Sequence, residues 1–181
     1  MIITLWWKAW SWKGTVSKII AEELNYEIIS IWSLKRKLAE EMGLSILEFN
    51  RLWEKPENQE KFDLKYEEYQ KNLNTNDNIL LESRLWFLCQ PNAFKVFLDV
   101  SDEIASKRIL GDNRTTDKFS SQQETLKAVK ERNESDQKRY LDLYWVDLRD
   151  KSHYDLIIDT SEKTPQQVAK EIINWLEKYN K

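Results

Sequence analysis

Apolar positions along the chain follow two patterns, short continuous runs and longer segments with helical spacing. The short runs are rich in β-branched and aromatic residues, and they predict strands at residues 2–5, 27–31, 78–82, 94–100 and 154–159. Elsewhere, apolar residues recur every three or four positions, which predicts helices at 13–25, 33–42, 45–53, 57–74, 102–110, 122–144 and 164–179. Alternating strands and helices are typical of a parallel α/β sheet.

The predicted strands contain few polar residues, which favours a sheet covered by helices on both faces. A chain of 181 residues without an internal repeat suits a single domain. Thr164 is the expected N-cap of the last helix, because Pro165 follows it at a position where proline begins helices. The segment 111–123 is polar and lies between two predicted helices, so we interpret it as a surface flap.

Charge and composition narrow the range of partners. The formal net charge is −3, so no overall basic field favours nucleic acid or an anionic membrane. The sequence shows no leader pattern and no apolar run near the roughly 18 residues that a membrane span requires. We therefore expect a cytoplasmic monomer that binds small molecules. Cys89 is the single cysteine, which excludes an internal disulfide.

Tryptophan and glycine occur in abnormal numbers. The chain has nine tryptophans and three glycines, whereas an average usage of about 7% predicts about 13 glycines. The turn after the first strand of an α/β sheet is where phosphate usually binds, because free N–H groups of the next helix point there. In this chain that turn reads WWKAWSWKGT. With glycine at its tryptophans it reads GGKAGSGKGT, which contains the phosphate-binding pattern G-x-x-x-x-G-K.

A phosphate-binding loop needs glycine for physical reasons. Its amides surround the anion, some of its residues take positive φ, and a Cβ would fill the space of the phosphate oxygens. Other tryptophans also stand where turns or helix ends favour glycine, namely Trp32, Trp53, Trp86 and Trp145. Reading all eight such tryptophans as glycine gives 11 glycines in 181 residues, about 6% and close to the ordinary value. Trp175, on the apolar face of the last helix, is instead predicted to be a core residue.

We hypothesise that the gene uses UGA as a glycine codon, as some bacterial lineages do, and was translated with tryptophan at those codons. Deliberate replacement of glycine by tryptophan is the alternative. UGG codons at Trp7, Trp10 and Trp12 would contradict the hypothesis.

With glycine restored, the chain resembles the cytidylate kinase family of nucleoside monophosphate kinases, especially its short archaeal-type members. The resemblance covers essentially the whole chain. Five segments carry it, and they are the loop ending in Lys13-Gly14-Thr15, IWSLKR, LLESR, the series Arg132-Asp136-Arg139-Tyr140, and YDLIIDT. The sequence departs from the family pattern at Ser33, where aspartate is common, and at Ser83, where glycine is common.

The resemblance implies a P-loop NTPase-like, three-layer α/β/α fold with a five-stranded parallel sheet. It also implies a core at 1–32, 76–110 and 146–181, a helical arm that binds the nucleoside monophosphate at 33–75, and a small lid at 111–145. The implied activity is transfer of the γ-phosphoryl group from ATP, with Mg²⁺, to CMP or dCMP.

Residue roles follow from the same resemblance. The ATP-binding loop comprises Trp7, Lys8, Ala9, Trp10, Ser11, Trp12, Lys13, Gly14 and Thr15. The acceptor nucleotide is assigned to Arg36, Arg84 and Asp136, and charge stabilisation during transfer to Lys13, Arg108, Arg132 and Arg139. Mg²⁺ could be oriented by Thr15, Asp99 or Glu82, although the two carboxylates could equally cap the turns that follow them.

The residues themselves support part of these roles. A lysine at a helix N-terminus opposes the helix dipole, so Lys13 favours a bound anion. Arg36 and Arg84 follow the carboxyl ends of strands, where open α/β sheets bind ligands. Positions 132, 136 and 139 share one helical face. Surface salt bridges are the alternative for the arginines of the two charged helices.

Other interpretations remain open. An adenylate kinase acting on AMP would share almost every argument above. The tryptophans near Lys8 and Lys13 could instead stack on single-stranded nucleic acid, although the acidic balance of the chain argues against this. His153 is expected in a turn or at the surface, and Cys89 is expected to be buried without chemistry. If the tryptophans are real, we expect ATP affinity and turnover to collapse.

Overall fold

The computed structural model describes residues 1–8, 10–53, 55–74, 77–111 and 119–179. Its strands are β1 (Ile2–Trp7), β2 (Glu27–Ser30), β3 (Ile79–Glu82), β4 (Phe94–Asp99) and β5 (Leu156–Asp159). Its α-helices are α1 (Lys13–Leu24), α2 (Ile31–Glu41), α3 (Ile46–Trp53), α4 (Pro56–Lys71), α5 (Trp86–Cys89), α6 (Asp102–Leu110), α7 (Gln122–Tyr144) and α8 (Pro165–Tyr179), and Lys151–His153 forms a 3₁₀ turn.

The five strands form one parallel sheet in the order β2-β3-β1-β4-β5. Ile3 pairs with Leu80 between β1 and β3, and Leu98 pairs with Ile158 between β4 and β5. Parallel neighbours require crossover connections, and the helices between the strands supply them. The predicted three-layer α/β/α class is confirmed, with β1 at the centre of the sheet.

The chain divides into two compact units, and each contains a hydrophobic core. Unit 1 comprises residues 1–5 and 24–94, and unit 2 comprises residues 6–23 and 95–181. In unit 1, one core cluster consists of Ile2, Ile29, Ile79, Leu81 and Ala93, and a second consists of Ala39, Phe49, Trp53 and Tyr66. In unit 2, α6 and α7 enclose Val100, Ala105, Ile109 and Val129.

The helix ends confirm several sequence expectations. Thr164 caps α8 reciprocally, because Thr164 N donates to Gln167 Oε1 at 2.8 Å and Gln167 N donates to Thr164 Oγ1 at 3.3 Å. Helix α7 ends where a glycine is expected, and Trp145 there has the left-handed values φ 55 and ψ 31. Residues 112–118 of the predicted flap lie outside the described residues.

Two expectations about single elements were incomplete or wrong. The four-residue helix α5 was not predicted, because so short a segment shows no helical period. Trp175 was predicted to be a core residue, but it is 44% exposed, whereas Ile172 and Leu176 beside it are 0% and 3% exposed. Trp175 therefore lies beside the buried stripe of α8.

In the described part of the chain, no helix is both long enough and apolar enough to span a bilayer.

Candidate functional site

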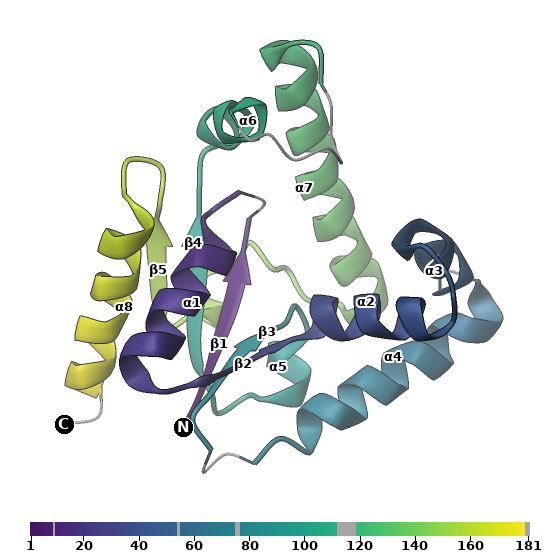
Figure 1. Ribbon diagram of the computed structural model, residues 1–181, viewed down its shortest axis with the longest axis horizontal. Coiled ribbons are helices and arrows are strands. Elements are labelled where there is room, and N and C mark those ends of the chain that lie inside the picture. The colour runs from purple at the N-terminus through teal and green to yellow at the C-terminus, as the bar shows by residue number, and fades with distance from the viewer. Residues whose placement is uncertain (9, 54, 75–76, 112–118, 180–181) are drawn as a thin grey trace. The chain divides into compact units, whose positions relative to one another are not determined.

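The turn between β1 and α1 contains two residues whose backbone has positive φ. The strand ends at Trp7 and the helix begins at Lys13, so the chain reverses direction within a few residues (Figure 1). Trp10 and Trp12 have φ of 67 and 66, a region that costs an L-residue about 1–2 kcal/mol. The backbone at these two positions is therefore in the region that glycine adopts freely. Ala9 lies outside the described residues.

The side chains of this turn do not fit a bound triphosphate as they stand. The Nζ atom of Lys13 lies 4.5 Å from the centroid of the Trp7 ring, in a cation–π contact. Ser11 is 1% exposed, and its Oγ has no hydrogen-bond partner among the described residues. The Trp7 indole therefore contacts the cation that is predicted to face the phosphates. Backbone conformation and side-chain volume conflict at this turn.

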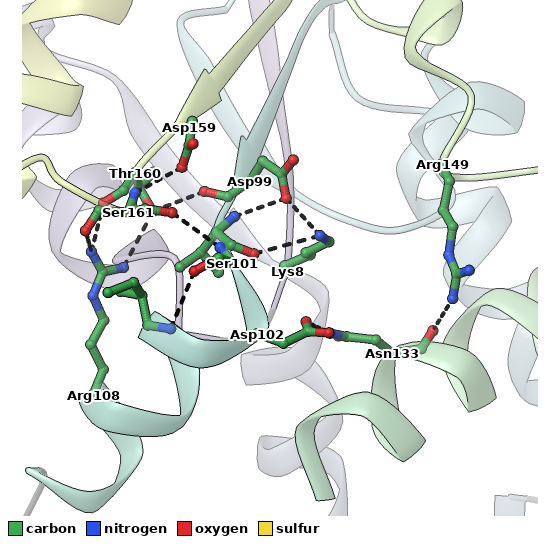
Figure 2. Close-up of polar contacts among 12 residues, drawn as sticks. Lys8, Asp99, Ser101, Asp102, Arg108, Asn133, Arg149, Asp159, Thr160 and Ser161 are labelled. Atoms are coloured by element: carbon green, nitrogen blue, oxygen red, sulfur yellow. Dashed lines mark hydrogen bonds and ion pairs between the residues drawn. The ribbon is translucent and has the colours of Figure 1, made fainter. Parts of the chain in front are cut away.

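Arg108 of α6 forms hydrogen bonds both to the turn and to the segment that follows β5, and Figure 2 shows its contacts with Thr160 and Ser161. Its Nη1 donates to Trp10 O at 2.9 Å and to Thr160 Oγ1 at 3.3 Å, and its Nη2 donates to Thr160 O at 2.6 Å and to Ser161 O at 3.2 Å. The guanidinium carbon also lies 4.4 Å from the Trp12 ring centroid. Burial lowers the pKa of Arg108. Four hydrogen bonds to protein atoms give this side chain a positional role, and its contact with substrate stays a prediction.

Lys8 in the turn forms an ion pair with Asp99, one of the predicted magnesium ligands. Lys8 Nζ lies 2.8 Å from Asp99 Oδ1 and donates to Val100 O at 3.5 Å, as Figure 2 also shows. A cation at Asp99 would have to displace this ammonium group. Glu82 is 5% exposed at the end of β3, and Thr15 is exposed on α1. Within the described ranges, no three His, Cys, Asp or Glu side chains gather as a metal site.

The two predicted acceptor arginines both lie in unit 1. Arg36 is exposed on α2, and its Cζ lies 5.5 Å from the ring centroid of Trp32. Arg84 is half-buried in the turn between β3 and α5. Each residue thus follows a strand at its carboxyl end, as predicted from the sequence, and binding of the acceptor by either stays a prediction.

The third predicted group lies on α7. Arg132, Asp136 and Arg139 all fall within this helix, and Arg132 is exposed. The side chains of Asp136 and Arg139 lie outside the described part of the structure. Their convergence on one ligand therefore stays a prediction.

Two residues without assigned chemistry have the expected environments. Cys89 is buried, and desolvation raises the pKa of its thiol to about 11. His153 lies in the 3₁₀ turn, with its Nε2 4.0 Å from Asp150 Oδ2. Neither observation indicates a catalytic site.

Several residues of the site were missed by sequence reasoning. Thr160 and Ser161 contact Arg108 mainly through backbone carbonyls, which carry no side-chain signal in a sequence. Lys8 was assigned to the loop, but its pairing with Asp99, which lies 91 positions further along, depends on the pairing of strands in the fold.

Comparison with known proteins gives a family-level result. Residues 2–162 match the model described as the cytidylate kinase-like family. A cytidylate kinase from Thermoplasma volcanium is 34% identical over 186 residues, which cover 100% of this chain and 94% of that protein. An S-adenosylmethionine-dependent nucleotide dehydratase from Lacinutrix mariniflava is 39% identical over 180 residues, but the match covers 98% of this chain and only 36% of the dehydratase.

Solved structures agree on the fold. A shikimate kinase from Bacteroides thetaiotaomicron superposes with a TM-score of 0.67 over 98% of both chains, at 14% sequence identity. Identity this low supports the shared architecture alone.

Proposed function

Because the chain belongs to the cytidylate kinase-like family, we propose that it transfers the γ-phosphoryl group of ATP to the 5′-phosphate of CMP or dCMP. The family and the fold together support a nucleotide kinase. The choice of a cytosine nucleotide is supported by the names of the archaeal relatives. We also propose that the protein acts as a cytoplasmic monomer.

The reaction needs positioning and charge neutralisation more than covalent catalysis. An oxygen of the acceptor 5′-phosphate attacks the γ-phosphorus of ATP, and the bond from that phosphorus to the β–γ bridging oxygen breaks. The products are ADP and CDP or dCDP. The acceptor phosphate is already ionised, so the reaction requires no strong general base.

The donor site is assigned to the turn between β1 and α1. In the glycine form of the loop, its amides and the Lys13 ammonium would hold the β- and γ-phosphates at the N-terminus of α1. Mg²⁺, when bound with ATP, would neutralise phosphate charge, with Thr15 as the nearest hydroxyl in the family pattern. The observation that carries this assignment is the positive φ of Trp10 and Trp12 within a strand-turn-helix segment.

The acceptor site is assigned to unit 1. Arg36 and Arg84 would bind the phosphate of the nucleoside monophosphate through charge-assisted hydrogen bonds, and the segment 33–75 would form the arm around the base. In unit 2, Arg132 and Arg139 would stabilise the spread charge of the transferring group, and Asp136 would contact the acceptor. The segment 111–145 would act as the lid.

A panel of nucleoside monophosphates tests the substrate assignment. The variant to use carries Trp7→Gly, Trp10→Gly and Trp12→Gly, because it removes the indoles that obstruct the loop. ADP formation from ATP should be fastest with CMP or dCMP. Faster turnover with AMP or UMP would overturn the cytidylate assignment and leave a nucleoside monophosphate kinase.

The dehydratase relative raises a second candidate function, modification of a nucleotide with S-adenosylmethionine. Its support is the 39% identity, and its weakness is that this chain spans 36% of the length of that protein. Incubation of the chain with a panel of nucleotides and S-adenosylmethionine, followed by mass spectrometry, separates the candidates. We expect no loss of water from the nucleotide, and a dehydrated product would favour the second candidate.

A further inference from the structure

A buried polar network lies at the end of β3, beside the turn that carries Arg84. Gln70 of α4 is 0% exposed, and Ser83 and Gln90 are 2% and 5% exposed. Polar side chains are costly to bury unless hydrogen bonds replace their contacts with water. Three buried polar side chains linked by hydrogen bonds therefore indicate a specific structural requirement at this place.

The hydrogen bonds of the network link α4 to the turn after β3. Ser83 Oγ donates to Gln70 Oε1 and accepts from the backbone N–H of Leu85 at 3.0 Å. Gln70 Nε2 donates to Tyr66 O at 2.9 Å, and Gln90 Nε2 donates to Gln70 O at 2.6 Å. The Ser83 hydroxyl thus donates its hydrogen to Gln70 on α4 and accepts a hydrogen bond from Leu85 in the turn.

This arrangement fixes the backbone on both sides of Arg84. Ser83 precedes Arg84, and the amide bound to the Ser83 hydroxyl belongs to Leu85, which follows it. Gln70 lies one residue before the last residue of α4. The end of α4 and the Arg84 turn are therefore held together by one buried hydroxyl, and all of these residues belong to unit 1.

We propose that Ser83 is a positioning residue for the acceptor nucleotide, because it holds the Arg84 turn against the C-terminal end of α4. The proposal rests on the proposed function, in which Arg84 binds the acceptor phosphate. Glycine is common at this position in the family that the sequence resembles, and glycine has no hydroxyl to form either hydrogen bond.

Calorimetric titration with CMP tests the proposal on the chain as it stands, since the acceptor site does not include the tryptophan-containing loop. Ser83→Ala should weaken CMP binding about five- to tenfold, the effect expected from losing roughly one net hydrogen bond. Ser83→Thr, which keeps the hydroxyl, should restore most of the affinity. Ser106→Ala is the matched control, because Ser106 is likewise buried, at 0% exposed, and donates one hydrogen bond, to Glu103 O at 2.8 Å, but lies in unit 2.

The outcomes separate the proposal from the function on which it rests. Weaker CMP binding by Ser83→Ala, with wild-type affinity in Ser106→Ala and a similar thermal midpoint in both, supports a positioning role. Equal CMP affinity in wild type and Ser83→Ala overturns that role and leaves the proposed function intact. Absence of CMP binding by the wild-type chain itself overturns both. If Ser83→Ala fails to fold, Ser83→Gly, which carries the residue common in the family, replaces it with the same expected loss.

Discussion

Three tryptophans have a backbone conformation that is unfavourable for tryptophan. Four residues other than glycine have positive φ among the described residues, and three of them are Trp10, Trp12 and Trp145. The fourth is Asn25, a residue type that tolerates this region through its short polar side chain. Tryptophan has no such compensation. The backbone at these positions therefore supports the hypothesis that they are glycine positions.

Trp145 gives the cleanest test of that hypothesis at one residue. It is 89% exposed and ends α7 in the left-handed region, so its side chain contributes little packing. Trp145→Gly should raise the free energy of unfolding by about 1 kcal/mol, because it removes the strain of positive φ. Urea unfolding measures the change.

Trp175→Gly is the matched control for this substitution. Trp175 lies within α8, where glycine costs about 1 kcal/mol relative to alanine, so the same replacement should lower the free energy of unfolding. Loss of stability in Trp145→Gly similar to that in Trp175→Gly would contradict the interpretation of Trp145.

Arg108 is the second residue whose role can be measured without any nucleotide. Arg108→Met keeps much of the apolar stem but removes the bonds to Trp10, Thr160 and Ser161. We expect a loss of about 1.5–3 kcal/mol in the free energy of unfolding, the range for hydrogen bonds to a charged group. Lys107→Met, at the exposed neighbouring position of α6, should change it by less than about 0.5 kcal/mol. Equal effects of the two substitutions would show that the bonds of Arg108 do not stabilise the fold.

At the scale of elements, the start of α3 shows how side chains stabilise a helix end. Ser45 and Glu48 form a capping box at the start of α3, because Ser45 N donates to Glu48 Oε2 at 2.8 Å and Glu48 N donates to Ser45 Oγ at 3.2 Å. The side-chain hydrogen bond from Ser45 is the largest cause that lowers the pKa of Glu48. The cap is therefore sensitive to acid.

The pH dependence follows from that lowered pKa. A carboxyl whose pKa is lower in the folded state stabilises the fold above its unfolded pKa, and this contribution is lost as the pH falls through the folded pKa. The fall in thermal midpoint between pH 6 and pH 3 should therefore be smaller for Glu48→Gln, which keeps an acceptor but does not titrate. Thermal unfolding followed by circular dichroism measures the difference. An unchanged fall in Glu48→Gln would show that this cap contributes nothing to acid sensitivity.

Elements were predictable where a repeating pattern marked them. The five strands and seven of the helices were predicted because apolar spacing extends over several residues in each. Helix α5 was missed because four residues are too few to show helical spacing of apolar positions. Trp175 was wrongly predicted to be buried, because the spacing of apolar residues along a helix does not show which of them lies at the edge of the buried face. The Ser83–Gln70 bond joins positions 13 apart, and no local pattern encodes it.

At the scale of the whole molecule, the predicted machinery falls into two groups of residues. The turn between β1 and α1, Arg108 and α7 belong to unit 2, and Arg36, Arg84 and the Ser83 network belong to unit 1. The sequence predicted the elements and turns on which these groups lie, because parallel strands present their carboxyl ends along one edge of a sheet. The contacts of Arg108 and Lys8 depended on tertiary packing and could not be predicted.

Calorimetric titration with ATP is the most direct test of the central claim, that residues 7–15 form a phosphate-binding loop in which indoles replace glycine. The chain as it stands is compared with the variant carrying Trp7→Gly, Trp10→Gly and Trp12→Gly. We predict saturable ATP binding by the glycine variant and none, or binding at least about a hundredfold weaker, by the tryptophan form, which corresponds to about 2.7 kcal/mol. Equal affinity of the two proteins for ATP, or no binding by the glycine variant, would contradict the claim.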